Sequence, residues 1–197
     1  MTTVYSGASM SIDGYISGPG ETGFEHLFQW YGNGDVEVPT GDPNMTLRMS
    51  QVSADHWREV LSLTGALVVG RKLFDAMGGW GGKHPADKPV VVLTHREAPE
   101  GWEDKPFTFV TEGIERAIAV ASELAGGKGV GLNGGTIASQ ALDAGLLDEV
   151  WVDLVPVLLG GGTPFFSALG TVPVTLDGPI TVTEGTSVTH MRYRVRR

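Results

Sequence analysis

Three segments of the sequence place basic side chains, hydroxyl groups or paired glycines directly after an apolar stretch. The segments are Gly70-Arg71-Lys72, Thr94-His95-Arg96 and Asn133-Gly134-Gly135-Thr136-Ile137. Backbone N–H groups at the start of a helix favour an anion, and a neighbouring Arg or Lys adds positive charge. Open α/β sheets bind their ligands at the loops that follow parallel strands. If these loops are neighbours, they form a positive pocket that suits a phosphate group.

Each segment also has a purely structural interpretation. Gly70-Arg71-Lys72 could be a tight turn with solvated cations, and Arg96 an unrelated charge on a separate loop. For Gly134-Gly135, packing explains one glycine more easily than two in succession. Without Cβ atoms, both would let a pyrophosphate approach the backbone, where Thr136 adds a hydroxyl. The run Gly160-Gly161-Gly162-Thr163-Pro164 either lets the backbone approach a planar substrate or forms a flexible connection.

Other kinds of site find little support in the motifs. Residues 129–134 match G-x-G-x-x-G, but the first two glycines fall inside an expected strand, whereas the dinucleotide fingerprint needs the strand before them. No metal site is expected, because cysteine is absent and the five histidines show no H-x-x-x-H spacing. Neither a G-x-S-x-G elbow nor a G-x-x-x-x-G-K-[ST] loop occurs. The solvated face of a terminal strand is expected at the alternating residues His190, Arg192, Arg194 and Arg196.

The hydrophobic pattern predicts an α/β protein. Strands are expected at Thr3–Met10, 66–69, 89–93, 107–110, 129–132 and 150–159. Helices are expected at 24–30, 51–63, 114–125 and 136–144, and around Leu73, Phe74 and Met77. Residues 32–46, rich in glycine and proline, are expected to form one long irregular loop. A hairpin of 181–184 and 188–195 would add antiparallel strands at one side of a largely parallel sheet.

Composition limits the classes of protein that remain. The chain has 197 residues, 41% hydrophobic and 19% charged, so a single domain over residues 1–197 with one sizeable core is expected. A net charge of −9 argues against a nucleic-acid-binding or basic membrane-binding surface. No apolar run approaches the ~18 residues of a membrane span. Met1–Ile12 does not resemble a signal peptide, and the absence of cysteine fits a reducing cytosol, so a cytoplasmic protein is expected.

In their order along the chain, the motifs resemble the dihydrofolate reductase fold. They resemble more closely the reductase domain of the bifunctional deaminase–reductase of riboflavin biosynthesis. The segments that carry the resemblance are Ala8–Gly14, Val69–Lys72, Leu93–Arg96, Asn133–Ile137, Pro156–Thr163 and, as in stand-alone relatives of that domain, His190–Val195. The resemblance covers about residues 2–195. It implies a mixed, mostly parallel sheet flanked by helices, with a C-terminal antiparallel hairpin.

The resemblance also implies NADPH as the cofactor. It places the nicotinamide carboxamide near Ala8 and Ile16. The pyrophosphate would lie at Gly70-Arg71-Lys72 and, after Asn133, at Gly134-Gly135-Thr136-Ile137. The 2′-phosphate would lie near Thr94-His95-Arg96. In this fold the Gly134–Gly135 peptide is often cis. The cation cluster, inferred independently from the residues, suits NADPH better than NADH.

One position departs from the dihydrofolate reductases. They carry an acid on the first helix, and the corresponding position here falls near Phe28, which cannot act as an acid. Folate reduction is therefore the weaker alternative. Asp13 is the acid expected near the nicotinamide, unless it only stabilises its turn. Trp30 and Trp80 are candidates to stack on a planar substrate, or else rim or interface residues.

The main functional hypothesis is an NADPH-dependent reductase that transfers hydride to a small heterocyclic or ribosylamino-pyrimidine-like substrate, as in the reductase domains of riboflavin biosynthesis. The alternatives are a dihydrofolate or pterin reductase and a non-catalytic NADP(H)-binding module. A homodimer through the exposed end of the sheet is expected from the resemblance, with a small molecule as the other partner. Residues 18–50 are expected to shape the substrate pocket.

Overall fold

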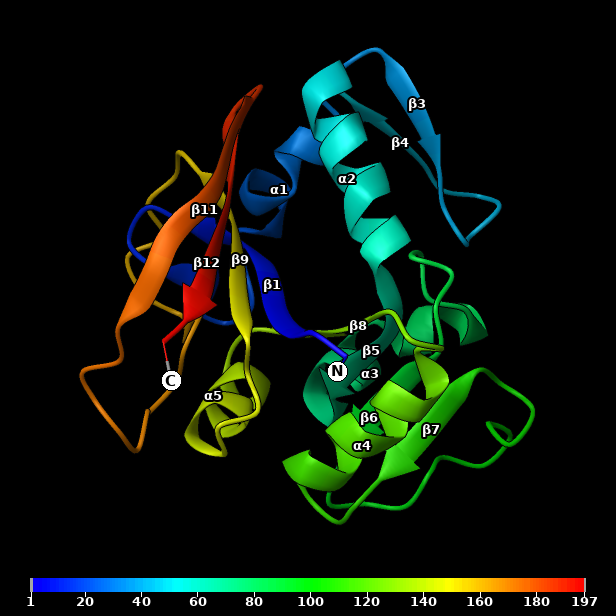
Figure 1. Ribbon diagram of the computed structural model, residues 1–197. Coiled ribbons are helices and arrows are strands. Elements are labelled where there is room, and N and C mark those ends of the chain that lie inside the picture. The colour runs from blue at the N-terminus through cyan, green and yellow to red at the C-terminus, as the bar shows by residue number, and fades with distance from the viewer. Residues whose placement is uncertain (1, 197) are drawn as a thin grey trace.

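An eight-stranded sheet runs through the centre of the protein in the computed structural model, which describes residues 2–196 (Figure 1). The strand order is β11-β12-β9-β1-β8-β5-β6-β7. The strands are β1 (Val4–Ser11), β5 (Thr64–Gly70), β6 (Val90–Leu93), β7 (Phe107–Val110), β8 (Gly129–Leu132), β9 (Glu149–Val155), β11 (Leu176–Gly185) and β12 (Val188–Val195). Neighbours from β9 to β7 are parallel, whereas β12 pairs antiparallel with β9 and β11. The expected mixed sheet with its C-terminal hairpin is confirmed.

Helices cover both faces of the sheet. They are α1 (Phe24–Leu27), α2 (Gln51–Leu63), α3 (Arg71–Ala76), α4 (Ile114–Leu124) and α5 (Thr136–Asp143), with 3-10 turns η1 (Gln29–Tyr31) and η2 (Gly78–Gly82). In β5, Val68 packs with α4 and α5, while Val69 packs with α3 on the other face. Consecutive strand residues point to opposite faces, so both faces of the central strands must be apolar. None of the helices in the described part of the chain is long and apolar enough to cross a membrane.

Two of the helices follow directly from their sequence. The Oγ of Ser50 accepts the N–H of Ser53 at 3.3 Å, which caps the start of α2 at the predicted place. In α4 the buried residues are Ile114, Ala117, Ile118 and Ala121, the apolar positions at helical spacing. The predicted helix at 24–30 is shorter, because α1 ends at Leu27 and the chain continues as η1.

Residues 32–46 are not one irregular loop, so that prediction is wrong. β3 (Val36–Pro39) lies within the segment and pairs antiparallel with β4 (Thr46–Met49). Val38 and Met49 are buried in a core cluster with Leu27 and Trp30, and this apolar contact holds the hairpin against the domain. A second short pair, β2 (Tyr15–Ser17) with β10 (Thr163–Pro164), was also not predicted.

A substitution at Gly65 tests how closely the end of α4 packs against the sheet. A Cβ atom at this position would lie 2.1 Å from the carbonyl oxygen of Ala125, directly after α4. Because backbone cannot move aside cheaply, we expect Gly65→Ala to lower the free energy of unfolding by about 3 kcal/mol. Urea denaturation measures this. The matched control is Gly32→Ala, where the nearest atom is the Gln29 oxygen at 3.9 Å. Equal stabilities of the two variants would contradict the packing argument.

Candidate functional site

A pocket of about 320 Å³ opens at the carboxyl ends of β5, β6 and β7 and at the first turn of α5. It brings together most of the residues predicted to bind the cofactor, namely Gly70, Arg71, Lys72, Thr94, His95, Arg96, Thr136 and Ile137. The remaining lining residues are Leu93, Thr111, Gly113 and Gln140, so the described lining holds no Asp or Glu. β6 pairs directly with β5, which places the loops after these strands side by side. The predicted convergence of the basic loops is therefore present.

One carboxylate fixes the two arginines of this pocket. Asp75 on α3 accepts Arg71 Nε at 2.7 Å through Oδ1 and Arg96 Nη2 at 2.6 Å through Oδ2. The hydrogen bond from Arg71, and then that from Arg96, hold the pKa of Asp75 below its ordinary value. Arg71 Nη1 also donates to the carbonyl oxygen of Glu97 at 3.0 Å. Since two guanidinium groups share one carboxylate, an excess of positive charge remains to attract an anion.

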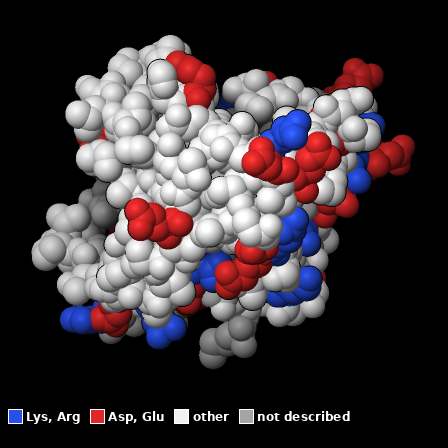
Figure 2. All heavy atoms as spheres, turned by 90° about the horizontal axis from the view of Figure 1, so that it is seen from above, with Lys and Arg blue, Asp and Glu red and all other residues white. Residues whose placement is uncertain are grey.

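The third basic side chain links the pocket to a neighbouring loop. Lys72 forms an ion pair with Glu21, in the segment between β2 and α1. Thr94 is buried and its Oγ1 accepts the N–H of Arg96 at 3.0 Å, which leaves the hydroxyl proton to donate. On the face that Figure 2 shows, basic side chains lie beside acidic ones and large areas are uncharged. This face carries no continuous basic stripe, in keeping with the negative net charge.

The loops after β1, β8 and β9 meet at the same edge of the sheet. A Cβ atom at Gly134 would lie 2.9 Å from Ile16 Cδ1, and one at Gly135 would lie 3.4 Å from Thr163 Cγ2. Gly135 has φ +74°, and its N–H donates to the oxygen of Phe165 at 2.7 Å. Backbone conformation therefore accounts for Gly135, whereas the closest contact at Gly134 is with the end of the flexible Ile16 side chain, in agreement with the expectation that packing explains one glycine more easily than two.

Smaller expectations at this edge have mixed outcomes. The N–H of Asn133 donates to the carbonyl oxygen of Val68 at 3.1 Å, so its backbone belongs to the sheet. Ala8 is partly buried in β1 beside Val152. The cis peptides of the described residues are Val172–Pro173 and Gly178–Pro179. The expectation of a cis Gly134–Gly135 peptide is therefore wrong.

The glycine run after β9 lies against the chain itself. Gly162 has φ +115°, and a Cβ atom there would lie 2.0 Å from the carbonyl oxygen of Ser17. Gly161 faces Pro19, and Thr163 pairs with Ser17 in the short β2–β10 sheet. Close backbone contact with β2 thus explains Gly162. These contacts hold the run against the chain, unlike the flexible connection considered as the alternative.

Asp13 holds this same run in place. Its Oδ1 accepts the hydroxyl of Ser11 at 2.6 Å and the N–H of Leu159 at 3.1 Å, and its Oδ2 accepts the N–H of Gly160 at 2.7 Å. The Ser11 hydrogen bond, supported by the two amides, lowers the pKa of Asp13. These contacts match the turn-stabilising alternative for this residue, extended to a second loop.

Neither predicted tryptophan has the place that stacking on a substrate requires. Trp30 is fully buried, and its Nε1 donates to Ser9 Oγ at 3.0 Å, so its ring is part of the core. Trp80 lies in η2 and stacks on Phe107 with ring centroids 6.4 Å apart. Phe107 is the first residue of β7, level with the first residue of β6. The pocket lined by Arg71 and Arg96 lies at the other end of these strands.

The predicted solvated face of the terminal strand is half wrong: His190 and Arg192 are buried, whereas Arg194 and Arg196 are exposed as predicted. His190 is 1% exposed and Arg192 is 8% exposed, because α2 covers this part of β12. The helix supplies their partners: Ser53 Oγ lies 3.0 Å from His190 Nε2, and Glu59 accepts from Arg192 Nη1 at 2.9 Å. The Arg192 guanidinium also lies 4.1 Å from the Trp151 ring centroid.

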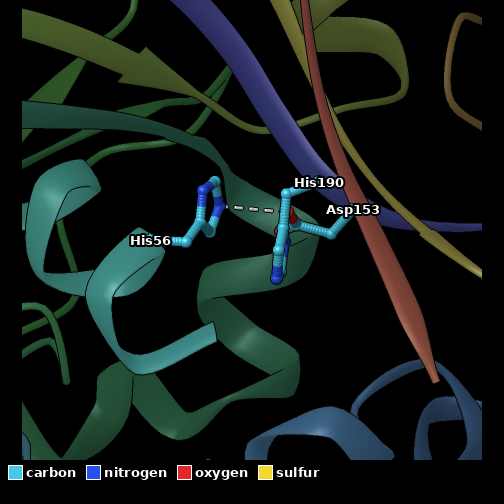
Figure 3. Close-up of side chains that lie close together, drawn as sticks. All are labelled: His56, Asp153 and His190. Carbon is cyan, nitrogen blue, oxygen red and sulfur yellow. Dashed lines mark hydrogen bonds and ion pairs between the residues drawn. The ribbon is translucent and has the colours of Figure 1, made fainter. Parts of the chain in front are cut away.

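A cluster of two histidines and an acid, which the sequence analysis missed, lies beneath α2. His56 of α2 and His190 of β12 both reach Asp153 of β9, with Nε2 and Nδ1 at 3.2 and 2.6 Å from Oδ1 (Figure 3). Burial raises the pKa of Asp153, but the hydrogen bonds from the two histidines outweigh burial and lower it. No short spacing joins these residues. The available signal was an acid, Asp153, inside the otherwise apolar run 150–155.

Comparison with known proteins gives one family. The sequence profile of the RibD C-terminal domain matches residues 2–188. A solved structure from Shewanella sp. PV-4, named for riboflavin biosynthesis, is 25% identical with a TM-score of 0.73, over 100% of both chains. A curated relative, the uncharacterized protein YwjB of Bacillus subtilis (strain 168), is 30% identical over 84 residues, which is 42% of this chain and 47% of YwjB. This chain thus matches about half the length of that relative.

Two more distant structures share the fold. A diaminohydroxyphosphoribosylaminopyrimidine deaminase/5-amino-6-(5-phosphoribosylamino)uracil reductase from Thermotoga maritima is 15% identical, with a TM-score of 0.61 over 99% of this chain and 57% of that one. The dihydrofolate reductase of Enterococcus faecalis, solved with NADP(H), is 15% identical with a TM-score of 0.52 over 99% and 97%. At these identities the likeness concerns the fold alone, and it confirms the expected dihydrofolate reductase-like architecture.

Asp13→Ala tests the clamp on the glycine run. The change removes the acceptor of three hydrogen bonds, so we expect the amides of Leu159 and Gly160 to exchange about tenfold faster, with little change in global stability. Hydrogen–deuterium exchange followed by NMR measures both. Asp177→Ala, which removes only an exposed ion pair with Arg196, is the matched control. Unchanged exchange in Asp13→Ala would show that the loop is held by other contacts.

Proposed function

The chain belongs to the RibD C-terminal domain family, and from this premise we propose that it is a reductase that uses NADPH to reduce a small heterocyclic or ribosylamino-pyrimidine-like substrate. The name of the Shewanella relative refers to riboflavin biosynthesis, and that of the Thermotoga relative to a uracil reductase, which supports this substrate class. The observation that carries the proposal is the convergence of Arg71, Lys72 and Arg96 on one pocket whose described lining holds no acid.

The pocket fits the phosphate groups of NADPH. Arg96 and the Thr94 hydroxyl, at the end of β6, would hold the 2′-phosphate. Lys72 and the first N–H groups of the eight-residue helix α5, which begins at Thr136, would hold the pyrophosphate. Leu93 and Ile137 offer apolar surface between these polar groups. NADPH, when bound, supplies the hydride, and the protein supplies orientation and charge.

The first helix favours this substrate class over folate. Phe28, at the position of the folate-reductase acid, is 42% exposed and stacks on Phe24. Glu25 of α1 points to solvent beside His26, with both side chains more than half exposed. No carboxylate of α1 is therefore available to a pterin. The same observation keeps the non-catalytic NADP(H)-binding module as the second candidate. It would bind NADPH without oxidising it in the presence of pyrimidine, pterin or flavin-precursor compounds.

NADPH binding is the first test. Intrinsic fluorescence titration is expected to show saturable binding of NADPH by the wild type. Arg96→Ala removes one charged phosphate contact, so NADPH affinity should fall roughly 10- to 100-fold while NADH affinity changes little. Lys128→Ala is the control, because Lys128 precedes β8 at the opposite end of the strands. The proposal fails if the folded protein binds no NADPH at millimolar concentration. Equal losses for NADPH and NADH would remove the 2′-phosphate assignment.

A second copy of the chain is the proposed protein partner. β11 is a ten-residue edge strand, and Ile180 and Val182 on it are 44% and 57% exposed. A long, apolar edge strand is suited to contact with another sheet. Light scattering should therefore give the mass of a dimer, and Val182→Glu should shift it towards the monomer. A monomeric wild type would refute this partner without affecting the reductase proposal.

A further inference from the structure

A polar row crosses the sheet face that α2 covers. Ser9 of β1 is level with Asp153 of β9, and Asp153 is level with His190 of β12. Residues at the same level of neighbouring strands point to the same face, so these three side chains lie in line. The row lies two residues before β1 ends at Ser11, roughly 7 Å from the edge where ligands bind in such sheets.

The contacts in this row form one chain of hydrogen bonds. Ser53 Oγ lies 3.0 Å from His190 Nε2, and His190 Nδ1 lies 2.6 Å from Asp153 Oδ1. The same oxygen is 3.2 Å from His56 Nε2. The two imidazole rings stack with centroids 3.9 Å apart and planes 16° apart, as Figure 3 shows. The Asp153 carboxylate is stable beneath α2 because both histidines lie within hydrogen-bonding distance of its Oδ1.

The inner and outer members of the chain differ in what they can reach. The His190 side chain is 1% exposed and both of its nitrogens are in use. The side chains of His56 and Asp153 are 10% and 18% exposed. His56 Nδ1 makes no hydrogen bond with the described residues, and it is not among the buried unpartnered polar atoms of that part of the chain. The cluster therefore opens to solvent on the side of His56.

Aromatic rings pack near this cluster, where the Trp30 ring meets His190 edge to face with centroids 5.0 Å apart. Tyr31 of η1 and Trp57 of α2 meet edge to face with centroids 5.6 Å apart, and Phe28 lies 5.5 Å from Tyr31. Burial, and then the Asp153 carboxylate, raise the pKa of Tyr31, so its hydroxyl stays neutral. Flat apolar walls beside a few polar atoms are the usual setting for a planar heterocycle.

Two other interpretations of the cluster do not fit the geometry. The order Ser53–His190–Asp153 is that of a hydrolase triad, but Ser53 is fully buried and no substrate can reach it. The three possible metal-ligand atoms of His56, Asp153 and His190 lie within 4.8 Å of one another. However, the lone pairs of stacked, nearly parallel imidazoles lie in the ring planes and do not converge on one ion.

We propose that His56 is the proton donor of the reductase, a catalytic residue that Asp153 and His190 position. This inference rests on the proposed function. Hydride adds to the carbon of a C=N bond, whose π electron pair moves to nitrogen. That nitrogen takes the proton from Nδ1 of the His56 imidazolium, and water then reprotonates the ring. NADPH is oxidised to NADP⁺ in the same turnover. The carboxylate that α1 lacks at Phe28 is thus replaced by one on β9.

The charged groups around His56 come from β9, β12 and α2 itself. Asp153 from β9 and His190 from β12 contact its ring. Arg192 of β12 lies two residues further along and is paired with Glu59 of α2. Among the described residues, Asp153 is the one that brings a negative charge into contact with the imidazole, so it holds the ring in place.

The experiment uses the full chain with 5-amino-6-(5-phosphoribosylamino)uracil as the probe. Single-turnover oxidation of NADPH is followed between pH 6 and 9, and NADPH affinity is measured separately by fluorescence. In His56→Gln we expect the rate to fall about 100-fold with NADPH affinity unchanged. The loss of rate at high pH, present in the wild type, should disappear in this variant. Asp153→Asn should also lower the rate with NADPH affinity unchanged, because it removes the carboxylate that holds the His56 ring. His26→Gln, an exposed histidine of α1, is the control.

Proton uptake measured without cofactor distinguishes proton donation by His56 from a purely structural role of this residue. Calorimetry of probe binding in two buffers of different ionisation enthalpy should show proton uptake by the wild type and none by His56→Gln. Full activity of His56→Gln overturns the inference and leaves the proposed function standing. NADPH binding without reduction of the probe by the wild type also overturns it, while the cofactor site stands. If NADPH does not bind at all, the proposed function itself fails.

Discussion

Parallel pairing is the constraint on which the rest of this structure depends. From β9 to β7 every strand runs in the same direction, so the loops that leave their carboxyl ends are forced to one edge of the sheet. The basic residues after β5 and β6 and the glycines after β8 are far apart in sequence and yet meet there. An acidic chain with a net charge of −9 thereby gathers positive charge at one place without a basic surface.

The sequence was informative where the signal is local. A strand, a glycine and two cations in succession identify a pocket wall, and Arg71 and Arg96 do line the same pocket. Helical spacing likewise located α4 and α5, and turn residues located the terminal hairpin. Such features depend on neighbours within a few residues, so the pattern of residue types carries them. Glycines were harder to interpret, because the atoms that contact Gly134 and Gly162 belong to loops that are distant in the sequence.

What could not be predicted depends on register and on covering elements. His190 looked solvated because alternation alone does not reveal that α2 lies over the strand. Asp153 and His56 share no motif, since three separate elements must be packed before they touch. Trp30 illustrates the same limit: it was expected at the end of a helix as a candidate to stack on a substrate, but the β3–β4 hairpin and the Ser9 hydroxyl enclose it. These contacts are products of the tertiary fold.

α2 is attached to the sheet at Ser53, His56 and Glu59, three positions spaced three residues apart, by contacts of 3.0, 3.2 and 2.9 Å. Any rotation of the helix about its axis, or any slide along it, would strain all three together. The helix and the strands beneath it therefore behave as one rigid body, and the His56, Asp153 and His190 side chains keep a fixed arrangement.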